Sequence, residues 1–97
     1  MALSFLWDKR KATTNLRKHG IAFEEAVTVF WDPLMLTVPD HEHSNGEERF
    51  ISIGRTWRDR LITVAHTESG DTIRIISARR ATPKETRMYE EGEDFRS

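Results

Sequence analysis

The 97 residues suit one compact domain, and a content of 32% charged and 37% hydrophobic residues is typical of a globular protein rather than a disordered one. The absence of cysteine excludes disulfides, thiolate nucleophiles and cysteine-based zinc sites. A net charge of −1 argues against strong nonspecific binding to nucleic acid, although basic residues gather over 9–18, 55–60 and 74–87 and could form a local basic face.

The first elements in chain order are a short strand and a helix. Residues 4–7 predict the strand, and Asp8 is a good N-cap for a helix that Gly20 ends in the left-handed conformation. Ala12 and Leu16 mark the stripe of this helix that we expect to be buried.

A second helix is expected over 23–31, where apolar residues recur at intervals of three and four. They form one continuous face of Phe23, Ala26, Val27, Phe30 and Trp31. Asp32-Pro33 ends this helix, and we expect both Trp7 and Trp31 to lie in the core.

Four strands follow, with an acidic loop over 40–48 after the first of them. Their expected ranges are 34–38, 49–54, 61–66 and 72–78. Ser69-Gly70 is expected to close a tight hairpin between the last two strands. These elements predict an α+β fold in which the two helices cover one face of the sheet.

Closing the hairpin at Ser69-Gly70 gives a register for the sheet. It places Arg49 beside His66 at the rim. The face toward the helices would then carry Ile51, Ile53, Ile62, Val64, Ile73 and Ile75. A slip of one residue would invert this assignment, because side chains alternate between the two faces of a strand.

The last element is a helix that begins at Pro83 and ends at Gly92. Thr82 and Glu85 form a capping box at its start. We therefore expect a single domain over residues 1–92 and a frayed acidic tail over 93–97.

Arginines gather around this last helix and form the densest candidate site. The group consists of Arg74, Arg79, Arg80 and Arg87, together with Glu85 and Tyr89 on one helical face. Arginines can bind a phosphate and its developing charge, and a carboxylate, histidine or phenol can move protons. The alternative is a solvated basic helix with ion pairs between successive turns.

Arg49 and His66 form a second candidate, because their expected placement at the rim could orient a phosphate. The alternative is a histidine satisfied at a strand end and an arginine paired with Glu48 or Glu68. Lys18-His19 could supply a cation and a base, although the helix dipole also explains basic residues at a helix end.

The basic loop 55–60 carries Trp57, which could stack on an RNA base or fold back on the sheet. His41 and His43 have the composition of a metal site, together with Asp40 and Glu42, but a solvated loop is the favoured interpretation. We expect no metal and no cofactor, and no glycine-rich phosphate loop or nucleophile elbow is present.

The order of several short motifs resembles the BrnT family of type II toxins. The N-terminal motifs are Trp7-Asp8, Lys11-Ala12, Asn15, Lys18-His19-Gly20 and Phe23-Glu24-Glu25-Ala26. The middle and C-terminal motifs are Glu48-Arg49-Phe50, Ile53-Gly54-Arg55, Val64, His66-Thr67-Glu68, Ile73-Arg74-Ile75-Ile76-Ser77-Ala78-Arg79, Glu85 and Tyr89. Together they span about residues 5–92. Ala22 departs from the pattern, since a small capping residue such as serine is common there, and the acidic total is unusual for an RNA-cutting toxin.

The resemblance implies a RelE-like fold, with two helices on a curved antiparallel sheet of four to five strands and a C-terminal helix. It implies a metal-independent endoribonuclease that leaves a 2′,3′-cyclic phosphate, blocks translation and arrests growth. The implied partner is a BrnA-like, DNA-binding antitoxin that represses the shared operon. The alternative is a catalytically weak binding module that pairs with this antitoxin in autoregulation, while direct DNA binding by this chain alone is not expected.

The expected functional residues divide into two sets. The catalytic set is Arg49, His66, Arg79, Glu85 and Tyr89. The RNA-binding set is Lys18, His19, Arg55, Trp57, Arg58, Arg74 and Arg80. The first residues lack the pattern of a secretory signal, and no apolar run approaches the ~20 residues that span a bilayer, so we expect a cytoplasmic protein.

Overall fold

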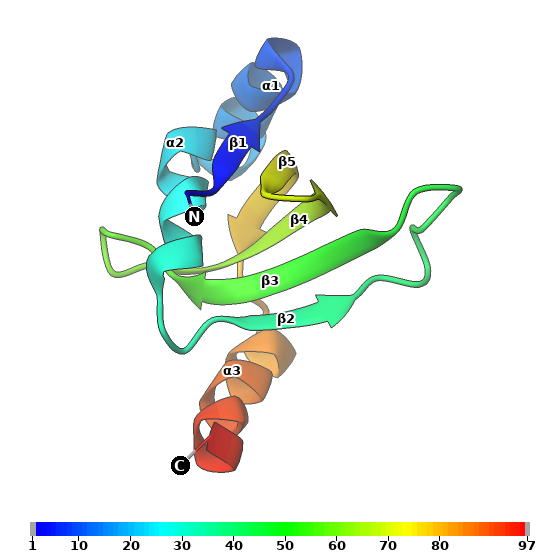
Figure 1. Ribbon diagram of the computed structural model, residues 1–97. Coiled ribbons are helices and arrows are strands. Elements are labelled where there is room, and N and C mark those ends of the chain that lie inside the picture. The colour runs from blue at the N-terminus through cyan, green and yellow to red at the C-terminus, as the bar shows by residue number, and fades with distance from the viewer. Residues whose placement is uncertain (1, 97) are drawn as a thin grey trace.

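The computed structural model describes residues 2–96, with side chains for residues 2–92. In chain order the elements are β1 (Ser4–Leu6), α1 (Lys9–His19), α2 (Phe23–Ala26), the 3₁₀ helix η1 (Val27–Trp31), β2 (Leu36–Pro39), β3 (Arg49–Arg55), β4 (Leu61–Ser69), β5 (Thr72–Arg80) and α3 (Pro83–Arg96). The predicted α+β class is confirmed, with one five-stranded sheet in the order β1-β5-β4-β3-β2 (Figure 1). The sheet is mixed rather than antiparallel, because β1 runs parallel to β5.

Helix α1 begins and ends where its capping residues predict. The Asp8 side chain accepts hydrogen bonds from the amides of Arg10 and Lys11 at 2.8 and 3.1 Å, and Gly20 closes the helix with φ of 71°. The expected buried stripe is only partly right, since Leu16 is half exposed and Asn15 is the buried residue of this helix.

Asn15 joins α1 to the edge of the sheet. Strand β1 pairs only with residues 72–74 of β5, so the edge of β5 near Ala78 needs another partner. The Asn15 amide donates to the carbonyl of Ala78 at 2.8 Å and accepts from its N–H at 3.0 Å. It also donates to the carbonyl of Ile21 at 2.9 Å, which ties the α1–α2 turn to the same point. One buried side chain therefore satisfies backbone groups of two segments.

The second helical segment tightens from α2 into the 3₁₀ helix η1 after Ala26. Its buried apolar residues, Phe23, Ala26 and Val29, are spaced by three, as suits three residues per turn. A continuous α-helix would have turned Trp31 inward, but Trp31 is 65% exposed. The expectation that Trp31 lies in the core is therefore wrong.

The register between β3 and β4 differs by one residue from the expected one. Phe50 pairs with His66 and Ser52 pairs with Val64, while the β4–β5 hairpin turns at Gly70-Asp71 with a bulge between Ala65 and His66. The helices consequently cover Ile62, Val64, Ile73, Ile75 and Ala78, as the core cluster shows. Ile51 and Ile53, expected on that face, lie on the opposite one, because a one-residue slip reverses a whole strand.

Helix α3 extends from the sheet at the end away from α1 (Figure 1). Its capping box forms as expected: Thr82 Oγ1 accepts from the amide of Glu85 at 3.1 Å, and Glu85 accepts from the amide of Thr82 at 2.9 Å. The helix continues to Arg96, past the end expected at Gly92. Within residues 2–96, no helix combines the length and the apolar character that a membrane span requires.

Replacing Asn15 tests how far the fold depends on this one amide. We expect Asn15→Ala to lower the free energy of unfolding by about 3 kcal/mol, because buried amide and carbonyl groups lose their partners. Urea denaturation followed by circular dichroism measures this change. Thr14→Ala, at an exposed neighbouring position, is the control and should differ little from the wild type, whereas equal midpoints for the two variants would contradict the role given to Asn15.

Candidate active site

A hollow of about 200 Å³ lies on the face of the sheet that α1 and α2 leave open. We call it the arginine groove, and its lining residues are Asp40, His43, Arg49, Ile51, Thr63, Ala65, Ser77 and Arg79. Ile51, Ala65 and Ser77 form its floor, since they pair across β3, β4 and β5. The register difference in β3 turns Arg49 to this face, and the bulge in the β4–β5 pair turns Arg79 to it.

Arg79 is held in place by a two-pronged ion pair with Glu85. Its two terminal nitrogens donate to the two carboxylate oxygens at 2.7 and 2.9 Å. Thr63 Oγ1 also donates to Glu85, at 2.9 Å. Burial raises the pKa of Glu85, but these bonds outweigh it and lower the pKa to about 2. Glu85 is therefore a fixed anion that orients Arg79, and it holds no proton to donate near neutral pH.

Arg49 differs from Arg79 because its guanidinium forms no ion pair with any described carboxylate. Its backbone is fixed, since its amide donates to Ser44 Oγ at 2.9 Å and its carbonyl accepts from the amide of Asp40 at 2.8 Å. The side chain is half-buried at the groove wall. An arginine with a fixed backbone and no carboxylate partner is suited to bind an anion from outside the protein.

His43, expected in a solvated loop, lies in that loop and also lines the groove. Its Nδ1 lies 2.9 Å from Asp40 Oδ2, and the His43 side chain is 60% exposed whereas that of Asp40 is 11% exposed. The spacing of three residues was the sole sequence signal for this pair. Asp40, Glu42 and His43 also bring possible ligand atoms within 4.8 Å of one another, but exposed acidic groups often gather in this way without an ion.

The expected rim pair of Arg49 and His66 is wrong. His66 is fully buried on the helix face of the sheet, where its ring contacts Phe30 and Phe50 at centroid distances of 5.0 and 5.9 Å. Its Nε2 lies 2.7 Å from Ser52 Oγ, and burial lowers its pKa to about 4. Arg49 pairs with Thr67 instead, on the opposite face, because the strand is shifted by one residue.

Tyr89 does not line the groove, although it was expected to share a face with Glu85. It is buried, and its hydroxyl donates to Asp32 Oδ2 at 2.7 Å. Burial raises the pKa of Asp32, but hydrogen bonds from the Arg55 amide, Tyr89 and the Leu34 amide outweigh it, so the pKa is lowered. Tyr89 thus fastens α3 to the end of η1.

Basic residues of α1 extend the arginine groove. A second hollow of about 300 Å³ is lined by Arg10, Lys11, Thr14, Asn15, Lys18, His19, Ile76 and Ser77. Ser77 lines both hollows, so they adjoin. The structure therefore brings Lys18 and His19 next to the groove, as a basic extension of it.

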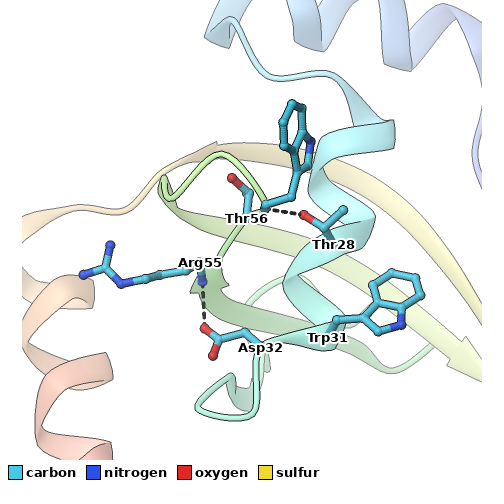
Figure 2. Close-up of a pocket in the computed structure, with 6 residues that line it drawn as sticks. Thr28, Trp31, Asp32, Arg55 and Thr56 are labelled. Atoms are coloured by element: carbon cyan, nitrogen blue, oxygen red, sulfur yellow. Dashed lines mark hydrogen bonds between the residues drawn. The ribbon is translucent and has the colours of Figure 1, made fainter.

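The loop that carries Arg55, Trp57 and Arg58 lies at the other end of β3 and forms a separate hollow of about 520 Å³ (Figure 2). Trp57 is 72% exposed, and the Arg58 guanidinium lies 6.0 Å from its ring centroid. The Trp57 amide donates to Thr28 Oγ1 at 3.0 Å, and Figure 2 shows the Arg55 amide bonded to Asp32. This hollow is larger than the arginine groove, but its carboxylate, Asp32, already accepts hydrogen bonds from the Arg55 amide and the Tyr89 hydroxyl.

Two further expected RNA-binding arginines occupy different surroundings. Arg74 lies in the same row as Arg49 and Thr67, where its terminal nitrogen donates to Glu47 at 2.6 Å. Arg80 is exposed at the end of β5, opposite Ile62. Glu47 thus partly neutralises the charge of Arg74, and Arg80 lies at the end of the sheet rather than in the groove.

Comparison with known proteins agrees with this architecture. The crystal structure of the Brucella abortus ribonuclease toxin BrnT is similar in fold, with a TM-score of 0.65 and 24% sequence identity, over 84% of this chain and 99% of that chain. No curated protein matches the sequence. A family model described as the ribonuclease toxin BrnT of type II toxin-antitoxin systems matches residues 7–85. Because that match spans most of the chain, the protein belongs to the BrnT family of ribonuclease toxins of type II toxin–antitoxin systems.

Proposed function

We propose that this protein is a metal-independent endoribonuclease that blocks translation and binds its substrate across the arginine groove. The observation that supports this most is the pair of arginines on one sheet face, Arg79 held by Glu85 and Arg49 without a carboxylate partner in the described chain. Two guanidiniums on rigid strands can stabilise the charge that develops on a phosphate during cleavage.

The basic residues beside the groove would bind the RNA backbone. Lys18 and His19 extend the groove along α1, and farther along the RNA would lie Arg74, in the row of Arg49, and Arg80, at the end of β5. The Trp57 loop, with Arg55 and Arg58, would stack on a base at a more distant point of the strand. A net charge of −1 is compatible with this path, since RNA binding depends on the charge of the local surface rather than on the net charge of the protein.

The remaining expected catalytic residues have supporting roles in this proposal. Glu85 positions Arg79, because its carboxylate stays ionised. His66 and Tyr89 hold the core and α3, since both are buried and bonded to Ser52 and Asp32 respectively. We also propose that the fold is RelE-like.

The partner we propose is a BrnA-like, DNA-binding antitoxin, and the site of action is the cytoplasm, where RNA and antitoxin meet. Membership of a type II toxin–antitoxin family supports the existence of a protein antitoxin. Basic and apolar surface near the open face of the sheet offers it a docking area that would also cover the RNA path.

The first functional prediction concerns metal ions and products. Purified protein should cleave single-stranded RNA in the presence of EDTA and leave a 2′,3′-cyclic phosphate, since arginines rather than a metal neutralise the charge. Gel electrophoresis and mass spectrometry of the products measure this. Activity that is lost in EDTA and restored by a divalent ion would overturn the metal-free mechanism, and stable binding to the antitoxin without cleavage would favour the binding-module alternative.

The second prediction separates the groove from the Trp57 loop. Arg49→Ala and Arg79→Lys should each lower the cleavage rate roughly a hundred- to a thousandfold, because each removes a preorganised donor. Lysine at position 79 keeps a positive charge opposite Glu85 and so protects the fold. Arg58→Ala should retain catalysis and lose salt-sensitive RNA affinity. Circular dichroism checks folding, and full activity of both folded groove variants would place the site elsewhere.

The third prediction concerns Glu85 and pH. Its pKa of about 2 keeps Glu85 ionised between about pH 5 and 9. Glu85→Gln should therefore lower the rate roughly ten- to a hundredfold, and by the same factor at every pH in that range. The lowered pKa also stabilises the fold above pH 4.5, and this stabilisation is lost as the pH falls toward 2. Disappearance of an alkaline limb from the pH–rate profile would instead identify Glu85 as a proton donor.

A further inference from the structure

We propose that His43 is the general base of the RNA cleavage reaction and that Asp40 is its positioning residue. This inference rests on the proposed function and assigns a role that the arginines cannot fill. A guanidinium stays protonated at any working pH, so neither Arg49 nor Arg79 can accept the proton of a ribose 2′-hydroxyl. The reaction therefore needs another side chain within reach of the same phosphate.

Among the described residues that line the arginine groove, His43 is the histidine, and imidazole is the side chain that serves most often as a general base. Glu85 is committed to Arg79, and His66 is buried on the far face of the sheet. The charged groups that face His43 are Asp40 and Glu42 from its own loop, Arg49 from β3 and Arg79 from β5.

The contact with Asp40 gives His43 the arrangement of an oriented base. Nδ1 lies 2.9 Å from one Asp40 oxygen and 3.2 Å from the other, so the ring donates its Nδ1 proton to this carboxylate. The Nε2 atom is then the acceptor, and the side chain is exposed enough to meet a substrate. A carboxylate in this position fixes the tautomer and stabilises the imidazolium that forms.

The loop that carries His43 is anchored beside Arg49 by its own backbone. Asp40 and Arg49 pair through a backbone hydrogen bond of 2.8 Å, and Ser44 Oγ bridges the Asp40 carbonyl at 2.8 Å and the Arg49 amide at 2.9 Å. A turn from the His43 amide to the Asp40 carbonyl, at 3.3 Å, adds to this. The base and the unpaired arginine are thus positioned by the same few bonds.

The step balances as a transesterification. His43 Nε2 takes the 2′-hydroxyl proton, and the 2′-oxygen forms a bond to phosphorus while the bond from phosphorus to the 5′-oxygen breaks. Water protonates the leaving 5′-oxygen, and His43 returns its proton to solvent. Arg49 and Arg79 stabilise the additional negative charge on the phosphoryl oxygens. The products are a 2′,3′-cyclic phosphate and a 5′-hydroxyl end.

The test uses the full chain, a single-stranded RNA oligonucleotide and single-turnover cleavage in EDTA across about pH 5 to 9. His43→Ala should lower the rate at neutral pH roughly a hundredfold or more, flatten the acid side of the pH–rate profile and recover in part with added imidazole. Asp40→Asn should lower the maximal rate roughly tenfold with little change in the RNA concentration for half-maximal rate. His41→Ala, exposed in the same loop, is the matched control and should behave as the wild type.

Three outcomes would overturn the inference while leaving the proposed function intact. In the first, the His43→Ala variant keeps the wild-type rate and pH profile. In the second, His43→Ala weakens RNA affinity but leaves the cleavage rate unchanged. In the third, His41→Ala lowers the cleavage rate as much as His43→Ala does. If the wild type itself fails to cleave RNA in EDTA, the proposed function fails, and this inference fails with it. Circular dichroism of each variant confirms that lost activity is not lost folding.

Discussion

The close approach of η1 to β3 at Gly54 determines which face of the sheet carries Arg49 and the proposed site. A side-chain carbon at position 54 would lie 2.8 Å from Val29 Cγ1 and 3.2 Å from Asp32 Oδ2, so only glycine allows this contact. Gly54 must therefore face the helices. Alternation along β3 then turns Ser52 inward and sends Arg49 and Ile51 to the open face. The contact at Gly54 therefore places Arg49 on the groove face, and the bulge in the β4–β5 pair places Arg79 there.

The acidic groups of the protein explain how a chain with nearly balanced charges can keep a basic groove. Glu25 pairs with Arg60, with the guanidinium Nε at 2.8 Å from Oε2, and this bond anchors the Trp57 loop to α2. Glu85 orients Arg79, and Asp32 binds Tyr89 and the end of β3. Each of these carboxylates is used internally to hold an element in place.

The two faces of the sheet differ in how their polar side chains are satisfied, and the proposed site lies on the open face. The helix face buries His66 between aromatic rings and satisfies its Nε2 through Ser52, which also lies 2.8 Å from Thr37 Oγ1. On the open face, Arg49 has no carboxylate partner among the described residues, and His43 is largely exposed. Unpaired charge costs little at a solvated surface, which is why a binding groove can remain there without destabilising the core.

The sequence by itself determined the local features of this protein. Asp8 and Gly20 bound α1, and Thr82 and Glu85 start α3, because capping depends on residues within a few positions of one another. The four later strands and the α+β class were also predictable from short apolar runs between turn residues. The family motifs were spread over the whole chain and could be read in order without knowing the register.

Only the tertiary structure decided which side chains meet. A one-residue difference in register moved Arg49 away from His66 and turned Ile51 into the groove, and no local pattern distinguishes the two registers. The same holds for Asn15 at the edge of β5, for Trp31 at the surface and for His43 beside Arg49. These placements depend on contacts between segments far apart in the chain, where packing and backbone hydrogen bonding outweigh the preferences of any single segment.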